Sequence, residues 1–437
     1  MKNAVAGIVQ RLRSYAESNP SIPETVAAFA IKLVGAMLSF GFSFLVARHL
    51  GAAGSGSYAL ALTTATFAAG ISLLGLDYVL LRTMAGDVRE GNLAAARGAA
   101  RTTLLVSALA AIIIGGIVAG VGAPLLALAV QRGLDQSIVY LAAIAVLPIT
   151  INRVAVAALR GSGGVLAAQW LEGPQAMLIS VAVLLIAITG NIAVDAFDVV
   201  LLYFSTVVVC AALAWLVYAR KARAWPVAAP TTALPMIAQG WRISLVVLSR
   251  LVLDWAVLLS LGAYYSTFEV GQFRTAWQIS ALIMLLVSTF DTVAGPRIAA
   301  AWRVGDIANI RSLIRQSVFA MLLMSSPLFV IALGFPEWAL GLFGPEFVAG
   351  APALRILALG QLVNVVSGPI GTVMLMTGQE RTSLYVAMFS IAVLLVLCFT
   401  LIPAFGLIGA ALTTSIIIGS RTIVSYLLVR KSLRLPG

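Results

Sequence analysis

Charged residues are scarce in this sequence. Only 10% of its 437 residues are Asp, Glu, Lys or Arg, whereas 61% are hydrophobic. Average soluble domains carry roughly a quarter charged residues, so this composition excludes an ordinary water-soluble domain. Apolar runs of about 20 residues, the length that crosses roughly 30 Å of hydrocarbon, recur from Val26 to Leu428. The sequence therefore predicts an all-α polytopic membrane protein.

Histidine and cysteine are also nearly absent. The one histidine, His49, cannot assemble a His-based metal site by itself. The two cysteines, Cys210 and Cys398, lie in apolar runs, where a small buried side chain is the expected role and a disulfide is not. No P-loop motif is present, which argues against ATP hydrolysis by this chain. We therefore predict no metal site, no cofactor and no enzymatic activity.

The apolar runs predict about twelve transmembrane spans. They lie near residues 26–47, 57–80, 102–129, 137–158, 165–189, 193–218, 241–263, 271–292, 313–334, 350–376, 383–402 and 406–428.

The basic residues, which give a net charge of +12, follow this predicted topology. If the N-terminus is cytoplasmic, the outer loops carry only Arg48 and Arg132, and nearly all other loop Lys and Arg residues lie on the cytoplasmic side. This is the positive-inside pattern, so we predict that both termini are cytoplasmic. A nucleic-acid site would need a basic soluble module, which the sequence lacks, and no nucleic-acid partner is expected.

The two halves of the chain align at a shift of about 215 residues. Gly56 and Tyr58 correspond to Gly271 and Phe273, Asp77 and Arg82 to Asp291 and Arg297, and Arg97 and Arg101 to Arg311 and Arg315. Chance similarity between apolar helices is the alternative, but it does not readily explain matched Gly, Asp and Arg residues at helix ends. Because six spans separate the repeats, both halves keep the same orientation around an axis along the membrane normal.

This repeat predicts two six-helix lobes around a central cavity. The N-lobe covers 26–218, a cytoplasmic linker covers 219–240 and the C-lobe covers 241–437. Residues 1–25 are predicted to be cytoplasmic and form either an interfacial amphipathic helix or a basic tail.

Ionisable residues inside the predicted spans are the candidate site, because a charge at the bilayer centre costs at least about 2.5–3.5 kcal/mol. The residues predicted to line the cavity or bind substrate are Lys32, Arg153, Glu172, Arg242, Arg250, Asp254 and Arg274. Their positive excess favours an anion that approaches from the cytoplasm, and arginine suits phosphate or pyrophosphate. Arg250 and Asp254 are four residues apart, so mutual neutralisation on one helical face is the alternative for them.

Two further roles are predicted for ionisable groups. Glu172 precedes Pro174, which predicts a helix kink, and either Glu172 or Asp254 can carry a coupling proton if transport uses an ion or proton gradient. Gating ion pairs at the inner face are predicted from Asp77, Arg82, Asp291 and Arg297. A pair between Asp77 and Arg82, which are five residues apart, requires Arg82 to reach back from the end of its helix.

The segment from Leu45 to Ala85 resembles the first repeat of the polysaccharide flippases (O-antigen and exopolysaccharide type) in the multidrug/oligosaccharidyl-lipid/polysaccharide (MOP) exporter superfamily. The residues that match the pattern are Leu50, Gly51, Gly56, Tyr58, Leu74, Gly75 and Arg82. The resemblance implies a two-lobed flippase of the bacterial inner membrane. Such a flippase moves a polyprenyl-pyrophosphate-linked oligosaccharide to the periplasmic leaflet by alternating access. Its expected partners are this lipid-linked substrate, membrane lipids and other polysaccharide assembly proteins.

Three alternatives remain open at this point. A multidrug or cation antiporter of the same fold predicts an acidic cavity, and a lipid II flippase typically has fourteen helices. A membrane glycan polymerase or ligase usually needs a large periplasmic loop, whereas the longest outer connection here, about Gly334 to Gly350, is short.

Overall fold

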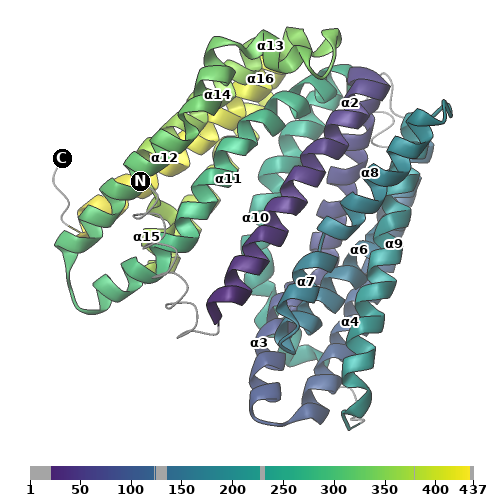
Figure 1. The fold of residues 1–437 in the computed structure, drawn as a ribbon, viewed down its shortest axis with the longest axis vertical. Coiled ribbons are helices and arrows are strands. Elements are labelled where there is room, and N and C mark those ends of the chain that lie inside the picture. Colours follow the sequence, from purple (N-terminus) through teal and green to yellow (C-terminus); the bar gives the residue numbers. More distant parts are fainter. Residues whose placement is uncertain (1–20, 123, 125–134, 227–231, 378, 434–437) are drawn as a thin grey trace, which may run out of the picture.

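The computed structural model describes the chain except residues 1–20, 123, 125–134, 227–231, 378 and 434–437 (Figure 1). The described residues form helices and no strand. The elements are α2 (Ser21–Leu73), α3 (Leu76–Arg89), α4 (Leu93–Ile117), η1 (Val118–Gly122), α6 (Gln136–Gly161), α7 (Val165–Leu171), α8 (Pro174–Thr189), α9 (Ala196–Lys221), η2 (Ala222–Ala224), α10 (Ala233–Tyr264), α11 (Thr267–Arg303), α12 (Ile307–Gly334), α13 (Pro336–Gly341), η3 (Pro345–Gly350), α14 (Ala351–Ser367), α15 (Ile370–Met376) and α16 (Glu380–Leu433).

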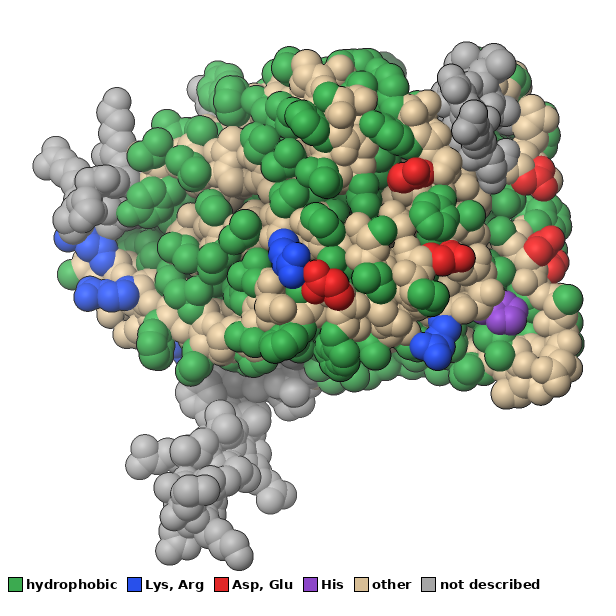
Figure 2. Space-filling model, turned by 90° about the horizontal axis from the view of Figure 1, so that it is seen from above, with side chains coloured by type: hydrophobic (Ala, Val, Ile, Leu, Met, Phe, Trp, Pro, Cys, Tyr) green, Lys and Arg blue, Asp and Glu red, His purple; other side chains and the backbone are tan. Residues whose placement is uncertain are grey.

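Nine helices in the described part of the chain are long and apolar enough to cross a bilayer. Their outward faces carry large apolar side chains, among them Ile144, Ile186, Phe319 and Phe399. Such faces are unfavourable in water but are solvated by lipid tails. Figure 2 shows the same composition from above, where apolar side chains cover most of the surface and charged side chains are few and scattered. The chain is a multi-pass membrane protein.

Two of the nine helices are about twice as long as a bilayer requires. The apolar part of α2 has 44 residues and that of α16 has 48, so each exceeds 60 Å at roughly 1.5 Å per residue. Each is interrupted by a glycine with non-helical geometry, Gly51 at φ 68° and Gly406 at φ 53°. Only glycine adopts such angles readily, so each long helix consists of two shorter ones. Helix α11 is outside the nine, and the count of about twelve spans stays a prediction.

The helices form two lobes that meet at one end of the molecule and diverge toward the other (Figure 1). One lobe contains α2 to α9, and the other contains α11 to α16. We call the end that holds Gly51, Gly406 and α13 the outer end, after the predicted topology. The predicted lobe boundaries at residues 218 and 241 stay predictions, since α9 continues to Lys221 and α10 begins at Ala233.

Matching caps confirm the internal repeat at the start of α4 and α12. Gly91 and Gly305 both have positive φ, at 78° and 73°. The side chains of the next residues, Asn92 and Asp306, then accept a hydrogen bond from a backbone N–H in the first turn of their helices. The same turn chemistry therefore starts a helix in each lobe.

Helix α10 packs against both lobes. Near its start, Gly240 lies so close to Leu74 that a Cβ on Gly240 would stand 2.5 Å from the Leu74 carbonyl oxygen. Farther along, Trp255 stacks on Phe67 of α2, with ring centroids 4.8 Å apart. The last turns of α10 belong to the core of the other lobe, where Leu261 is fully buried. This helix therefore connects the two lobes by its packing as well as by its sequence position.

Two repeat-related glycines bring the lobes together at the outer end. A Cβ on Gly56 of α2 would overlap with the carbonyl oxygen of Thr267, and a Cβ on Gly271 of α11 would overlap with that of Ala52. The backbones of α2 and α11 are therefore in direct contact, which side chains on these glycines would prevent. The glycines that the sequence repeat aligned are thus the residues at which its two copies touch.

Polar contacts from the loop after α13 reinforce this closure. The Glu346 carboxylate accepts a hydrogen bond from the Ala52 N–H at 2.9 Å, and the Gln272 side-chain amide donates to the Glu346 carbonyl oxygen at 2.5 Å. Arg48 donates to the Leu342 carbonyl oxygen at 2.9 Å. Because Gly51 interrupts α2, Ala52 starts a new helical segment whose free N–H groups favour a carboxylate. We call these contacts the outer latch.

The glycine contact predicts that the effect of a Gly→Ala substitution on stability depends strongly on its position in α2. Gly56→Ala should force α2 and α11 apart and lower the stability of the closed form by about 1–3 kcal/mol, as overpacking does elsewhere. Gly41→Ala is the matched control, because a Cβ there meets no atom within 4 Å. Thermal unfolding of the purified variants in detergent measures the difference. Equal melting temperatures for the two variants would contradict the contact.

The outer latch predicts that loss of the Glu346 carboxylate opens the outer end. Glu346→Ala should increase the labelling rate of a cysteine placed at Ser55, which is buried at the Gly271 contact, by a membrane-impermeant maleimide, because the N–H of Ala52 loses its acceptor. Glu346→Gln keeps an acceptor oxygen and should stay near the wild-type rate. If both variants label as slowly as the parent, the latch does not hold the closed form.

Candidate functional site

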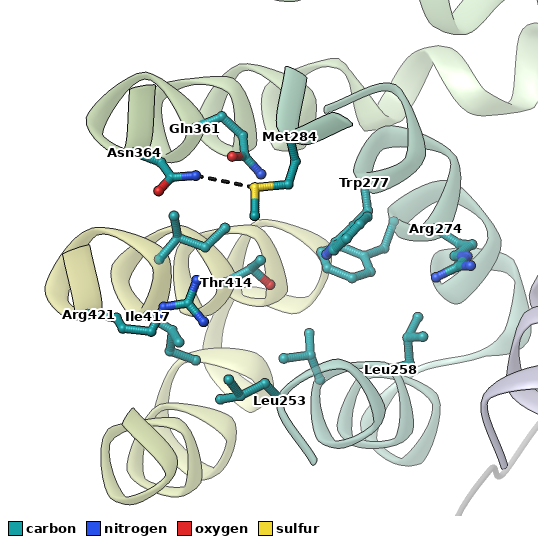
Figure 3. Close-up of a pocket in the computed structure, with 13 residues that line it drawn as sticks. Leu253, Leu258, Arg274, Trp277, Met284, Gln361, Asn364, Thr414, Ile417 and Arg421 are labelled. Carbon is teal, nitrogen blue, oxygen red and sulfur yellow. Dashed lines mark hydrogen bonds between the residues drawn. The ribbon is translucent and has the colours of Figure 1, made fainter. Parts of the chain in front are cut away.

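A cavity lies inside the C-lobe, between α10, α11, α14 and α16. Its volume is about 180 Å³, and apolar side chains such as Leu253, Leu258 and Ile417 form much of its wall (Figure 3). The charged side chains among its described lining residues are Arg274 and Arg421. The described part of the lining therefore carries positive charge.

The two arginines lie at opposite ends of this cavity, with Trp277 between them (Figure 3). Arg274 comes from the outer part of α11, close enough to the Tyr58 hydroxyl of α2 for electrostatic interaction. Arg421 comes from the second half of α16, and its guanidinium points into the space between α16 and α10 (Figure 3). A guanidinium keeps its charge when desolvated and presents several N–H donors, so both ends suit an anionic or oxygen-rich ligand.

Amide and hydroxyl groups complete the polar part of the cavity. Gln361 is only 4% exposed, and its Oε1 has no hydrogen-bond partner among the described residues. Asn364, one turn later on α14, donates to the Met284 sulfur at 3.3 Å and accepts from Thr422 at 3.4 Å. The contact with Thr422 is long and Gln361 Oε1 has no described partner, so the amides are available to a ligand with hydroxyl groups.

Sequence reasoning assigned Arg274 to the cavity but did not assign Arg421, Gln361 or Asn364. The signal for the two amides was present, because residues three apart on a helix share a face and polar pairs are rare in apolar spans. Arg421 falls within the predicted span near 406–428, but no neighbouring motif indicated that it faced a cavity.

Four intramembrane charges of the N-lobe form two opposite pairs. Arg153 of α6 contacts Asp77 of α3 at 3.6 Å, with side-chain exposures of 34% and 11%. Arg160, two turns later on α6, contacts Glu172 at 2.7 Å. Asp77 therefore contacts an arginine from another helix, whereas Arg82 is exposed in the middle of α3, and a pair between Asp77 and Arg82 stays a prediction. Arg153 and Glu172, predicted to line the cavity, have these partners as well.

The kink predicted at Pro174 is confirmed. Helix α7 ends at Leu171 and α8 begins at Pro174, so Glu172 stands at the break. Helix α2 crosses this break closely, since a Cβ on Gly35 would lie 2.7 Å from Pro174 Cγ. Lys32 stands about one turn from this crossing and is exposed. Lys32 is therefore near the Glu172 region, but no ion pair joins the two among the described contacts.

Several predicted residues cannot be placed by their side chains. The side chains of Arg242, Arg250, Asp254 and Asp291 lie outside the described residues, as does the predicted segment 1–20. Arg297, predicted as the gating partner of Asp291, is exposed on α11. In the described part of the chain no three His, Cys, Asp or Glu side chains come together as a metal site would require.

The Asp77–Arg153 pair predicts that Asp77 is needed for stability. Asp77→Asn should lower the free energy of unfolding by on the order of 2 kcal/mol, less than the roughly 3–5 kcal/mol of a fully buried pair because Arg153 is partly exposed. Arg82→Gln, at an exposed position of the same helix, should change it little. The double variant Asp77→Asn/Arg153→Gln should lose less than the sum of the single losses in detergent thermal unfolding. An additive double variant would contradict the pairing.

Comparison with known proteins agrees with this architecture. Residues 243–400 match the MatE family model. A "Probable low-salt glycan biosynthesis flippase Agl15" of Haloferax volcanii is 26% identical over 172 residues, which are 39% of this chain and 36% of that protein. A "Probable flippase AglR" of the same organism is 28% identical over 188 residues, 42% of this chain and 38% of that protein. The matches therefore span little more than a third of the length of these relatives.

A solved structure extends the similarity to nearly the whole chain. The inward-facing conformation of a multidrug resistance MATE family transporter of the MOP superfamily superposes with a TM-score of 0.71 at 16% identity. The superposition covers 94% of this chain and 98% of that one. The fold and the sequence matches together confirm the resemblance predicted from the sequence: the chain is a multi-pass membrane protein with the fold of this MATE family transporter and with sequence similarity to flippases.

Proposed function

We propose that this protein flips a lipid-linked oligosaccharide, carried on polyprenyl pyrophosphate, across the membrane by alternating access. The relative named as a glycan biosynthesis flippase supports the class of substrate. The observation that carries the proposal is the C-lobe cavity, whose described lining holds the guanidinium groups of Arg274 and Arg421 beside amides and an aromatic ring.

The chemistry of this cavity fits an anionic glycan better than a cationic drug. Guanidinium groups attract phosphate and sugar oxygens but repel the cations that a multidrug antiporter exports. The amides of Gln361 and Asn364 supply donors and acceptors that suit sugar hydroxyls, and Trp277 offers an aromatic face. The apolar wall leaves room for the lipid side of such a ligand.

The form of the molecule supports loading from the inner side. The outer latch and the Gly56–Gly271 contact close the outer end, and the lobes diverge toward the inner end (Figure 1). On this proposal the pyrophosphate and sugars enter from the cytoplasm, both termini are cytoplasmic, and the latch opens when the lobes rock. A location in the inner membrane and association with polysaccharide assembly proteins belong to the same proposal.

The other predicted site residues extend this proposal. Lys32, Arg242 and Arg250 would add positive charge along the substrate route, and Arg153 would hold the N-lobe in shape through Asp77. Glu172 or Asp254 would carry the proton if transport is coupled to a gradient, and Glu172 would then exchange its contact with Arg160 during the cycle. Asp291 and Arg297 would close the inner end when the outer end opens.

Neutralising the cavity should stop glycan export. In cells that depend on this chain, Arg274→Gln and Arg421→Gln should each lower surface polysaccharide by about 10- to 100-fold, the loss expected for one charge-assisted hydrogen bond. Lipid-linked precursor should accumulate on the inner leaflet, because synthesis continues while flipping stops. Immunoblots of surface glycan and extraction of the precursor measure both effects.

Arg355→Gln is the matched control, since Arg355 belongs to the same lobe and pairs with Glu337 outside the cavity, at 2.9 Å. It should leave export unchanged. If the cavity variants become sensitive to cationic drugs while the surface glycan persists, the protein is an antiporter and the proposal fails.

A further inference from the structure

A second cavity lies on the N-lobe, far from the one that carries the proposed function. It is a groove of about 360 Å³ between the start of α4 and the end of α9. Its walls are formed by Arg97, Arg101, Leu104, Leu105, Trp215, Tyr218, Ala219 and Ala222. We call it the α4–α9 groove. It combines two guanidinium groups, two aromatic rings and apolar side chains at one end of two membrane helices.

The groove contains two arginines, one held in place by a hydrogen bond and one without a described partner. Arg97 and Arg101 are one turn apart and so share a face of α4. The Arg97 side chain donates to the Trp225 carbonyl oxygen at 2.6 Å, which holds it in place and leaves its other N–H groups available. Arg101 is exposed and has no ion-pair or hydrogen-bond partner in the described part of the chain. The pair therefore has unused capacity for an anion.

Tyr218 gives an independent sign of a missing ligand. Its side chain is 3% exposed, and its hydroxyl has no hydrogen-bond partner among the described residues. A buried hydroxyl without a partner costs about 1–3 kcal/mol, which a bound acceptor would recover. The ring is held in position by Trp215 and Trp225, whose centroids lie 5.3 Å and 6.2 Å away. The Tyr218 hydroxyl also interacts electrostatically with Arg97. The two groups are therefore close enough to donate hydrogen bonds to the same ligand.

The apolar side of the groove continues into the lipid-facing surface. Leu105 is 56% exposed, and Leu109, Ile112 and Ile113 extend its exposed face along α4. Tryptophan and tyrosine are the residues that membrane proteins place at headgroup depth. A ligand in the groove therefore has its anionic part beside the arginines and an apolar part along α4, which matches a phospholipid rather than a free ion.

We propose that the α4–α9 groove binds the phosphodiester headgroup of an anionic membrane lipid. Arg97 and Arg101 pair with the phosphate, the Tyr218 hydroxyl donates to one of its oxygens, and an acyl chain lies along Leu105 and Leu109. Helices α4 and α9 both pack against α6, so the lipid joins two helices of the N-lobe at its basic end. The proposal stands apart from the transported substrate and does not depend on it.

Lipid titration of the purified full-length chain tests this site. Dioleoylphosphatidylglycerol, dioleoylphosphatidylcholine and inorganic phosphate are added separately to the protein in detergent. The melting temperature and the number of retained lipids, from native mass spectrometry, are recorded. Phosphatidylglycerol should raise the melting temperature and remain bound, whereas phosphatidylcholine and phosphate should do neither. An equal effect of phosphatidylcholine, or of phosphate alone, would overturn the proposal.

Variants locate the effect within the groove. Arg101→Gln, at an exposed position, should weaken the phosphatidylglycerol response about tenfold in concentration, the loss of one charge-assisted contact. Tyr218→Phe should keep or raise the melting temperature without lipid, because it removes an unpaired hydroxyl, and should weaken the lipid response. Arg89→Gln, an exposed arginine of α3 outside the groove, is the control and should respond as the parent does. A parent-like response of both groove variants would overturn the proposal.

Discussion

In the hydrocarbon core of a membrane, a polar or charged group finds a partner within the protein or in a cavity, because lipid tails provide neither hydrogen bonds nor counterions. This constraint explains why the described chain is helical throughout, since helices satisfy their own backbone groups. It also bears on where the intramembrane charges lie. In the N-lobe, Arg153 and Arg160 lie against Asp77 and Glu172. In the C-lobe, Arg274 and Arg421 border a cavity.

The internal repeat makes this difference between the lobes informative. At the shift that relates Gly56 to Gly271, Arg274 corresponds to Ala59, which is buried in α2. The two lobes share their helix starts and their contact glycines, so the scaffold was kept in both copies. The charge that distinguishes the C-lobe is an addition to that scaffold. Fold and binding chemistry can therefore vary separately, which is why one architecture serves transporters of different substrates.

The sequence predicted the features that depend on local pattern. Apolar runs predicted the helices, Pro174 predicted the break before α8, and the repeat singled out Gly56 and Gly271 before their contact was known. It did not predict long-range contacts. The sequence suggested a pair between Asp77 and Arg82, which are near neighbours in the chain, but it gave no sign that Arg153 of α6 contacts Asp77. Likewise, nothing near Arg421 in the chain indicates that Gln361 and Asn364 face the same cavity from α14. Contacts of this kind depend on how helices pack against one another, and the periodicity of apolar residues along the sequence carries no information about that packing.

The closure at the outer end has a further physical consequence for movement. The backbone contact at Gly56 and Gly271 acts only at short range, because it depends on van der Waals packing. The hydrogen bonds of Glu346, Gln272 and Arg48 lie around this contact. All of these contacts are lost when the lobes separate by a small distance. The outer end is therefore a two-state element, either closed or open, and does not open gradually. Helix α10 packs on the N-lobe through Trp255 and on the C-lobe through Leu261, so it must bend or slide when that state changes. The energy that opens the outer end therefore has to exceed the energies of the glycine contact and of the packing of α10 on the two lobes. A ligand that binds the open state more tightly than the closed state can supply this energy.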